Sequence, residues 1–252
     1  MKLVDAHFHL DLYKEPATVL SECEARGVYT IAVTNAPSVF AHTQRLATPT
    51  KHVRAALGLH PELVASHSHE LPDLLRLMEQ TRYIGEIGLD YVTSDTTLRK
   101  QQRDVFEAIL RRAADFGDRI LTVHSRRAAA DVIGCIGNSF PGTVILHWFS
   151  GSRRELHAGL EAAYYFSVNS AMIKSKKGSD LIREIPRDRL LTETDGPFID
   201  VDGRHALPTD VQQTVDGIAK VWNVDPTEAS SIVLSNFRRV VEAHVAQGKA
   251  VE

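Results

Sequence analysis

Histidines and carboxylates near the start of the chain have a spacing that suits metal binding. VDAHFHLD places His7 and His9 one residue apart, between Asp5 and Asp11. Residues two apart on a strand point to the same side, so both imidazoles can reach one ion. The alternative is a surface strand with outward polar residues, because short His-x-His matches also occur by chance.

Five further residues of the same kinds close apolar runs elsewhere, at His60, Glu86, His124, His147 and Asp195. Burying such a group without a partner costs several kcal/mol, so these residues are expected to share a site. One tetrahedral zinc ion needs only three protein ligands and a water. Two divalent ions about 3.5–4 Å apart, bridged by a carboxylate, would use the larger set.

The expected metal ligands are His7, His9, Glu86, His124, His147 and Asp195. Glu86 is the expected bridge, with His7, His9 and Asp195 on one ion and the other two histidines on the second. We expect the ions to lower the pKa of a shared water, whose proton Asp195 can accept or relay. Asp5 and Glu193 are either ligands or groups that orient imidazoles, and the sequence leaves both possibilities open.

The residues that would position this site lie at the ends of eight short apolar runs: 3–9, 29–35, 53–60, 83–90, 120–124, 143–150, 164–170 and 190–195. Amphipathic, helix-like segments alternate with them at 15–26, 71–80, 98–114, 126–137 and 152–162, and two more helices are predicted at 209–220 and 226–247. Near-continuous apolar runs are typical of parallel strands buried on both faces.

This alternation predicts an α/β fold, a (β/α)8 TIM-like barrel with a C-terminal helical tail, as a single domain over residues 1–252. Barrel enzymes place their chemistry at the C-terminal strand ends, where the polar residues fall. A doubly wound open sheet is the alternative. It would need a glycine-rich phosphate turn after the first strand, and HLDLYKE supplies none.

The net charge of −3 argues against a protein that coats nucleic acid through global positive charge. Cations nevertheless follow the later strands, at Arg126, Arg127, Arg153, Arg154, Lys174, Lys176, Lys177 and Arg204. A basic rim of this kind predicts a phosphate-rich substrate held locally. Trp148 and Phe149 either stack an unpaired base or pack the barrel rim.

The remaining features concern location. Cys23 and Cys135 have no CxxC spacing, which indicates reduced thiols and a cytoplasmic protein. Asp5 and His7 interrupt any N-terminal apolar segment, so we expect no signal peptide. No stretch approaches the roughly 18 apolar residues of a membrane helix, so no membrane partner is expected.

Six motifs in order make the chain similar to the TatD-family metal-dependent deoxyribonucleases: VDAHFHLD, GLHP (58–61), GEIGLDY (85–91), VHSR (123–126), LHWFSG (146–151) and TETDGP (192–197). The similarity spans nearly the whole chain and includes SNFRRVV (235–241) in its tail. It implies a distorted TIM barrel like that of the amidohydrolases. It also implies divalent ions (Mg²⁺, Zn²⁺ or Mn²⁺) and cleavage of DNA, often from the 3′ end.

By this resemblance, the six expected ligands match the family's metal ligands. His60 matches a substrate-phosphate contact, and Arg126 is a second candidate contact. The chain departs from the family at VTSDTT (92–97) and at 204–208, which are substrate-facing loops, so the preferred substrate stays open. DNA is the expected partner, as an end or a single strand. The alternatives are an amidohydrolase-like small-molecule hydrolase and a TatD-like subunit of an anti-phage defence complex.

Overall fold

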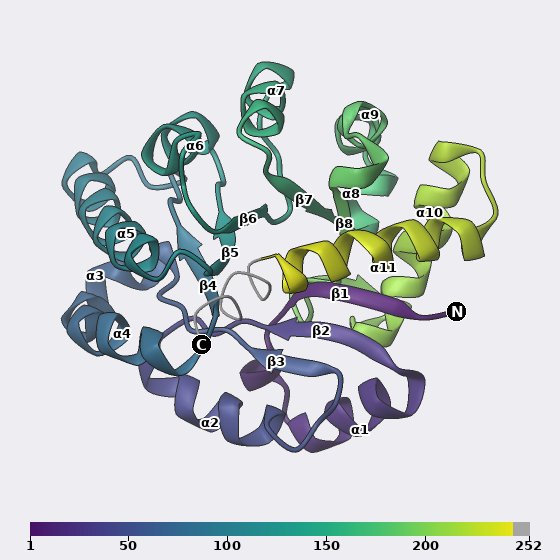
Figure 1. Ribbon diagram of the computed structural model, residues 1–252, viewed down its shortest axis with the longest axis horizontal. Helices are drawn as coiled ribbons and strands as arrows, with labels where there is room; N and C mark the ends of the chain where they lie inside the picture. The colour runs from purple at the N-terminus through teal and green to yellow at the C-terminus, as the bar shows by residue number, and fades with distance from the viewer. Residues whose placement is uncertain (244–252) are drawn as a thin grey trace, which may run out of the picture.

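Eight parallel strands ring the centre of the molecule and helices surround them (Figure 1). The computed structural model describes residues 1–243. The barrel strands are β1 (Leu3–Phe8), β2 (Val28–Ala32), β3 (Val53–Ala55), β4 (Tyr83–Gly88), β5 (Ile120–His124), β6 (Thr143–Leu146), β7 (Tyr165–Val168) and β8 (Leu190–Thr192). The predicted TIM-like barrel is confirmed, and the open doubly wound sheet is excluded.

The barrel is distorted, because its strands form two separate ladders, β1-β2-β3 and β4-β5-β6-β7-β8. An isolated bridge from Leu57 to Ile84 joins the first ladder to the second. On the other side, the Asp195 N–H donates to the His7 carbonyl (2.9 Å) and ties the end of β8 to β1. This link places two predicted ligands side by side.

Gly58 permits a close backbone approach at the first junction. A Cβ at this position would lie 2.2 Å from both the Glu86 nitrogen and the Thr34 carbonyl oxygen, so no larger residue fits. The Glu86 N–H also donates to the Thr34 carbonyl (3.1 Å), which holds β4 beside the end of β2. The predicted strand 53–60 is too long, since only Val53–Ala55 pairs as a strand.

The helices are α1 (Pro16–Arg26), α2 (Pro37–Ala47), α3 (Val64–His67), α4 (Leu71–Leu77), α5 (Thr96–Phe116), α6 (Ala129–Ile136), α7 (Arg153–Glu161), α8 (Ser170–Lys174), α9 (Lys176–Glu184), α10 (Val211–Trp222) and α11 (Pro226–Glu242). Short 3₁₀ turns lie at Leu10–Leu12, Pro61–Leu63, Ser68–Glu70, Met78–Gln80, Arg187–Arg189 and Pro208–Asp210. Capping side chains fix the residues at which several helices begin. Asp95 accepts from two backbone N–H groups at the start of α5, and Ser152 and Glu155 form a capping box on α7.

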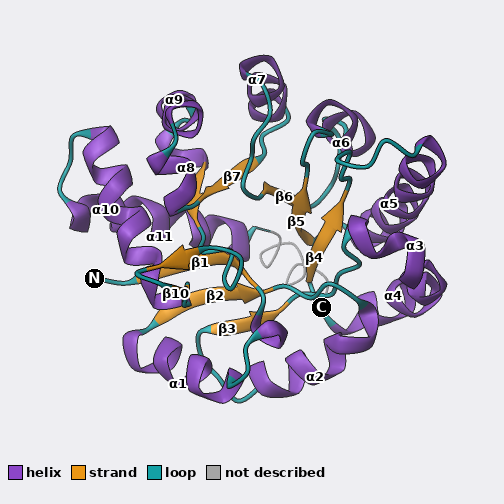
Figure 2. Ribbon diagram, turned by 180° about the vertical axis from the view of Figure 1, so that it is seen from behind, coloured by secondary structure: helices purple, strands orange, loops and turns teal. Residues whose placement is uncertain are grey.

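Four segments differ from the sequence prediction. Helices α2 and α3 and the pair α8–α9 were not predicted, and a small hairpin, β9 (Asp200–Val201) and β10 (Arg204–His205), follows β8. This hairpin lies over the barrel on the side seen in Figure 2. The predicted last helix is confirmed to Glu242, and the predicted stretch 244–247 lies outside the described residues.

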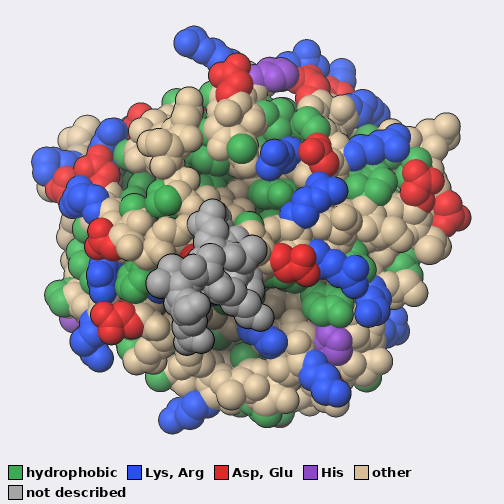
Figure 3. All heavy atoms as spheres, viewed as in Figure 1, with side chains coloured by type: hydrophobic (Ala, Val, Ile, Leu, Met, Phe, Trp, Pro, Cys, Tyr) green, Lys and Arg blue, Asp and Glu red, His purple; other side chains and the backbone are tan. Residues whose placement is uncertain are grey.

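Helix α11 fastens the two ends of the barrel together at the start of its strands. Asn236 donates to the carbonyls of Arg187 and Leu190 (2.7 and 2.8 Å), and the Ser230 hydroxyl donates to the Lys2 carbonyl (2.5 Å). The face on which α11 lies carries acidic and basic side chains interspersed (Figure 3). Within residues 1–243, no helix combines the length and the apolar character needed to cross a membrane.

Candidate metal centre

The six predicted ligands come together at the C-terminal strand ends, as three overlapping groups. These are His7–His9–Asp195, His7–Glu86–His147 and His60–Glu86–His124, and in each group one ligand atom per residue lies within 4.8 Å of the others. His60, predicted as a substrate contact, therefore also lies among the possible ligands. These side chains come from the ends of six strands, with His7 and His9 together on β1, so the barrel itself sets their spacing.

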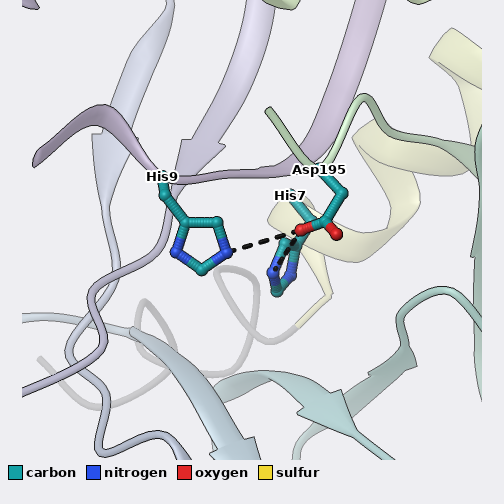
Figure 4. Close-up of side chains that lie close together, drawn as sticks. All are labelled: His7, His9 and Asp195. Carbon is teal, nitrogen blue, oxygen red and sulfur yellow. Dashed lines mark ion pairs between the residues drawn. The ribbon is translucent and has the colours of Figure 1, made fainter. Parts of the chain in front are cut away.

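The first group is buried, and its carboxylate points toward both imidazoles (Figure 4). Asp195 Oδ1 lies 3.6 Å from His7 Nε2 and 3.4 Å from His9 Nε2. His7 and His9 are 0% and 1% exposed, and both Nε2 atoms lack a hydrogen-bond partner among the described residues. A buried polar atom without a partner destabilises the fold by about 1–3 kcal/mol, so a ligand bound to these nitrogens would be stabilising.

Glu86 stands between this group and the others, and its two oxygens face different sides. Oε2 lies 3.4 Å from the Nε2 atoms of both His7 and His9. Oε1 lies 2.8 Å from His147 Nε2, 2.7 Å from His124 Nδ1 and 3.2 Å from His60 Nε2. One carboxylate thus connects two sets of imidazoles, which is the geometry expected of a bridge.

The electrostatics of this group favour an ionised Glu86 beside a neutral His7. Burial alone would raise the pKa of Glu86, but His60, His147 and His124 outweigh it and hold the pKa well below its usual range. Burial, followed by the neighbouring His147, lowers the pKa of His7 to about 3. Thr122 Oγ1 lies 2.7 Å from His7 Nδ1 and can accept a hydrogen bond from the Nδ1–H group. The lone pair of Nε2 then faces the carboxylates.

Asp90 is a functional candidate that the sequence analysis missed. Its Oδ2 lies 2.8 Å from His124 Nε2, so His124 is held between two carboxylates, Glu86 and Asp90. Burial opposes a charged imidazole here, yet Asp90 and Glu86 together raise the pKa of His124 to about 9. The signal was present in the sequence, because Asp90 ends the run 83–90 just as the chosen residues end theirs.

Asp5 and Glu193 are supporting residues, since neither belongs to the three ligand groups. Asp5 accepts from the backbone N–H of Thr194 (2.9 Å) and of His7 (3.3 Å), and so joins β1 to the loop that carries Asp195. Glu193 accepts from the Trp148 N–H (3.1 Å), next to His147. Trp148 and Asp195 have left-handed φ angles of 36° and 50°, a strained geometry common at functional sites.

The centre opens into a cavity of about 410 Å³ whose wall includes Arg126, Trp148 and Phe198. Phe198 is 59% exposed and meets the His9 ring edge-on, with the centroids 4.9 Å apart. Phe149, in contrast, is buried against Phe166 and cannot stack a base, so of the two predicted aromatics only Trp148 borders the cavity. Phe198 was not predicted.

The eight cations of the predicted basic rim fall into four sets. Arg126 lines the cavity of the metal centre, whereas Arg153, Lys176 and Lys177 line a second cavity. Arg204 pairs with Asp210 (2.6 Å). The other three cations, Arg127, Arg154 and Lys174, line neither cavity.

Comparisons with known proteins agree with this geometry. The profile of the family described as TatD related DNase matches residues 4–242. The chain belongs to this family. It is 28% identical to the metal-dependent hydrolase YcfH of Escherichia coli, over 95% of this chain and 96% of the relative. YabD of Bacillus subtilis, also named a metal-dependent hydrolase, is 28% identical over 94% and 98% of the two chains.

Among solved structures, the TatD homologue YjjV of Escherichia coli superposes with a TM-score of 0.85, at 24% identity, over 94% of this chain and 97% of YjjV. This likeness concerns the fold. Together with the family match, it makes the protein a TatD-family metal-dependent hydrolase.

The donor set of this TatD-family protein fits a divalent metal. It combines imidazoles with carboxylates, the ligands preferred by zinc and related transition ions, with carboxylates also suiting Mg²⁺ and Mn²⁺. Four of the buried nitrogens without a partner among the described residues belong to its histidines: His7 Nε2, His9 Nδ1, His9 Nε2 and His147 Nδ1. A site built only for hydrogen bonding would leave fewer such atoms unpaired.

Proposed function

We propose that this protein hydrolyses phosphodiester bonds of DNA at a centre of two divalent ions, which are Mg²⁺, Mn²⁺ or Zn²⁺. The observation that carries the proposal is Glu86, whose Oε1 and Oε2 face two separate sets of imidazoles at the base of one cavity. Arg126 in the same cavity supplies the positive charge that a phosphate needs. The family description as DNases supports the same substrate class.

The residues then divide the chemistry among themselves. When bound, divalent ions lower the pKa of a water and polarise a phosphoryl oxygen. Asp195 directs Oδ1 toward His7 and His9, while its Oδ2 makes no hydrogen bond within residues 1–243 and can accept the proton of the attacking water. Arg126 orients the substrate phosphate, and His60, 3.2 Å from Glu86, contacts the same phosphate or completes the second ion's ligands.

We further propose that the substrate is a strand end or a single strand. Phe198 is a large exposed aromatic at the wall of the cavity, and Trp148 borders the same space. Stacking of an unpaired base on such a ring stabilises binding by about 1–3 kcal/mol. A base inside a duplex cannot offer its face in this way. Cleavage from the 3′ end, which the resemblance implies, belongs to the same proposal.

The test is a cleavage assay on protein stripped of metal and reconstituted with Mg²⁺, Mn²⁺ or Zn²⁺. Single-stranded DNA, duplex DNA, RNA and a generic phosphodiester are compared, with the DNA labelled at either end. We expect hydrolysis of single-stranded DNA that depends on added metal and starts at the 3′ end. Absence of DNA cleavage with every ion, together with turnover of a small ester or amide, would instead favour the amidohydrolase-like alternative.

A further inference from the structure

A second cavity lies next to the metal centre, between the starts of α7 and α9. Its volume is about 490 Å³, and its wall includes Arg153, Lys176 and Lys177 together with Asp180. The two cavities meet along the chain, because Ser150 lines the metal centre and Gly151 lines its neighbour. We call this second cavity the basic groove.

The charges of the basic groove are not fully compensated. Arg153 pairs with Glu184 (2.6 Å), and the acid in the wall, Asp180, already pairs with Arg183 (2.9 Å). Lys177 donates to the Ser150 carbonyl (2.6 Å), and the Glu155 carboxylate of the α7 capping box lies beside Gly151 in the wall and offsets part of the positive charge. Lys176 is exposed and has neither an ion pair nor a side-chain hydrogen bond among the described residues. The groove therefore presents positive charge to solvent.

The position of these cations is intrinsically unfavourable. Arg153 opens α7, and Lys176 and Lys177 open α9, so each lies at the positive end of a helix dipole. Cations there cost a few tenths of a kcal/mol or more, while anions are stabilised. The stability of α7 and α9 therefore gives no reason for three cations at their N-terminal ends around one cavity. A bound anion would turn the same arrangement into a favourable one.

We propose that the basic groove binds the phosphates of the DNA strand that neighbour the scissile bond, so that the strand runs from the metal centre past Ser150 to Lys176. This inference rests on the proposed function and extends it, because it assigns a binding site for the non-reacting part of the substrate. The contacts are to phosphate alone, so they add affinity without base preference.

The matched variants are Lys176→Ala and Lys174→Ala. Both remove one exposed lysine from the same short segment, but Lys174, at the end of α8, does not line the basic groove. Binding of a labelled single-stranded hexanucleotide is followed by fluorescence anisotropy without divalent metal, across a range of salt concentrations. Turnover of the hexanucleotide, of a dinucleotide and of a generic phosphodiester is measured with metal.

We expect Lys176→Ala to reduce the slope of log affinity against log salt by about 0.7, the value for one lost single-strand phosphate contact. At 0.1 M salt this change in slope corresponds to a roughly five-fold weaker affinity for the hexanucleotide. The KM for the hexanucleotide should rise similarly, while the values for the dinucleotide and the generic phosphodiester stay unchanged. Lys174→Ala should match the wild-type protein.

If Lys176→Ala and Lys174→Ala bound and cleaved the hexanucleotide equally well, the proposed phosphate site in the basic groove would be ruled out. A loss in Lys176→Ala that is just as large on the dinucleotide would also rule it out, because a general structural defect would then explain it. Failure of the proposed function is separately visible, since a protein that cleaves no phosphodiester can still be tested by anisotropy. Binding that inorganic phosphate displaces at low millimolar concentration, with no dependence on strand length, would assign the groove to free phosphate and also overturn the proposal.

Discussion

The two sides of Glu86 differ in burial and in how their ligands are held. On the Oε2 side, His7 and His9 are buried and their Nε2 atoms lack hydrogen-bond partners among the described residues. On the Oε1 side, the His60 and His124 side chains are 13% and 14% exposed. There His124 is engaged by a carboxylate at each nitrogen. The Oε2 side is the more deeply buried and is preorganised for a ligand, although His9 and Asp195 border the cavity, and the Oε1 side is the more exposed.

This difference suggests unequal tasks for the two sides. Buried donors with no competing partners should hold an ion tightly, because binding satisfies atoms that are otherwise unpaired. The Oε1 side exchanges with solvent and borders Arg126, where the substrate phosphate would enter. We therefore expect a tighter ion at His7, His9 and Asp195 and a weaker one at His124 and His147.

The largest expected effect comes from Glu86→Gln, which removes the charge shared by both sides and keeps the size of the side chain. Metal-dependent DNA hydrolysis should fall on the order of 10³-fold, as for other losses of a central electrostatic group. Steady-state assays measure the change, and circular dichroism checks the fold. Glu161→Gln, at the exposed end of α7, is the matched control. Undiminished turnover of Glu86→Gln would remove the basis for a bridge.

Asp90→Asn should affect the Oε1 side alone. Asp90 holds His124 through Nε2, and loss of a carboxylate that orients a metal-binding histidine typically weakens metal affinity by about 10–100-fold. Calorimetric titration with Mn²⁺ should show a weaker second binding event and an unchanged first one. Asp104→Asn, on the exposed face of α5, serves as control. If both events weakened equally in Asp90→Asn, the two sides would not be independent.

A smaller effect is expected for Phe198→Ala, beside His9 on the Oε2 side. The KM for single-stranded DNA should rise about ten-fold, within the range for loss of one stacked base. Both metal-binding events should keep their affinities, because Phe198 touches only the edge of the His9 ring. Phe198→Tyr should restore the wild-type KM. An equal effect on a phosphodiester without bases would argue against stacking.

Sequence reasoning located the strand ends well because each combines an apolar run with a polar residue that cannot be buried alone. It did not predict α2, although Pro37 is a helix-start signal, because the buried face of this helix (Pro37, Phe40, Thr43 and Ala47) carries a single large apolar side chain. It missed Asp90 since a carboxylate at a strand end is recognised only when its partner is known, and His124 comes 34 residues later. The exposure of Phe198 and the burial of Phe149 depend on how the chain turns after β8 and β6.

The central claim is that two ions lie on either side of Glu86, and a crystal structure of the Mn²⁺-loaded protein with anomalous diffraction tests it most directly. We predict two anomalous peaks about 3.5–4 Å apart, one beside Oε2 with His7, His9 and Asp195 and one beside Oε1 with His124 and His147. A single peak under saturating Mn²⁺, or two peaks that do not share Glu86, would contradict the account.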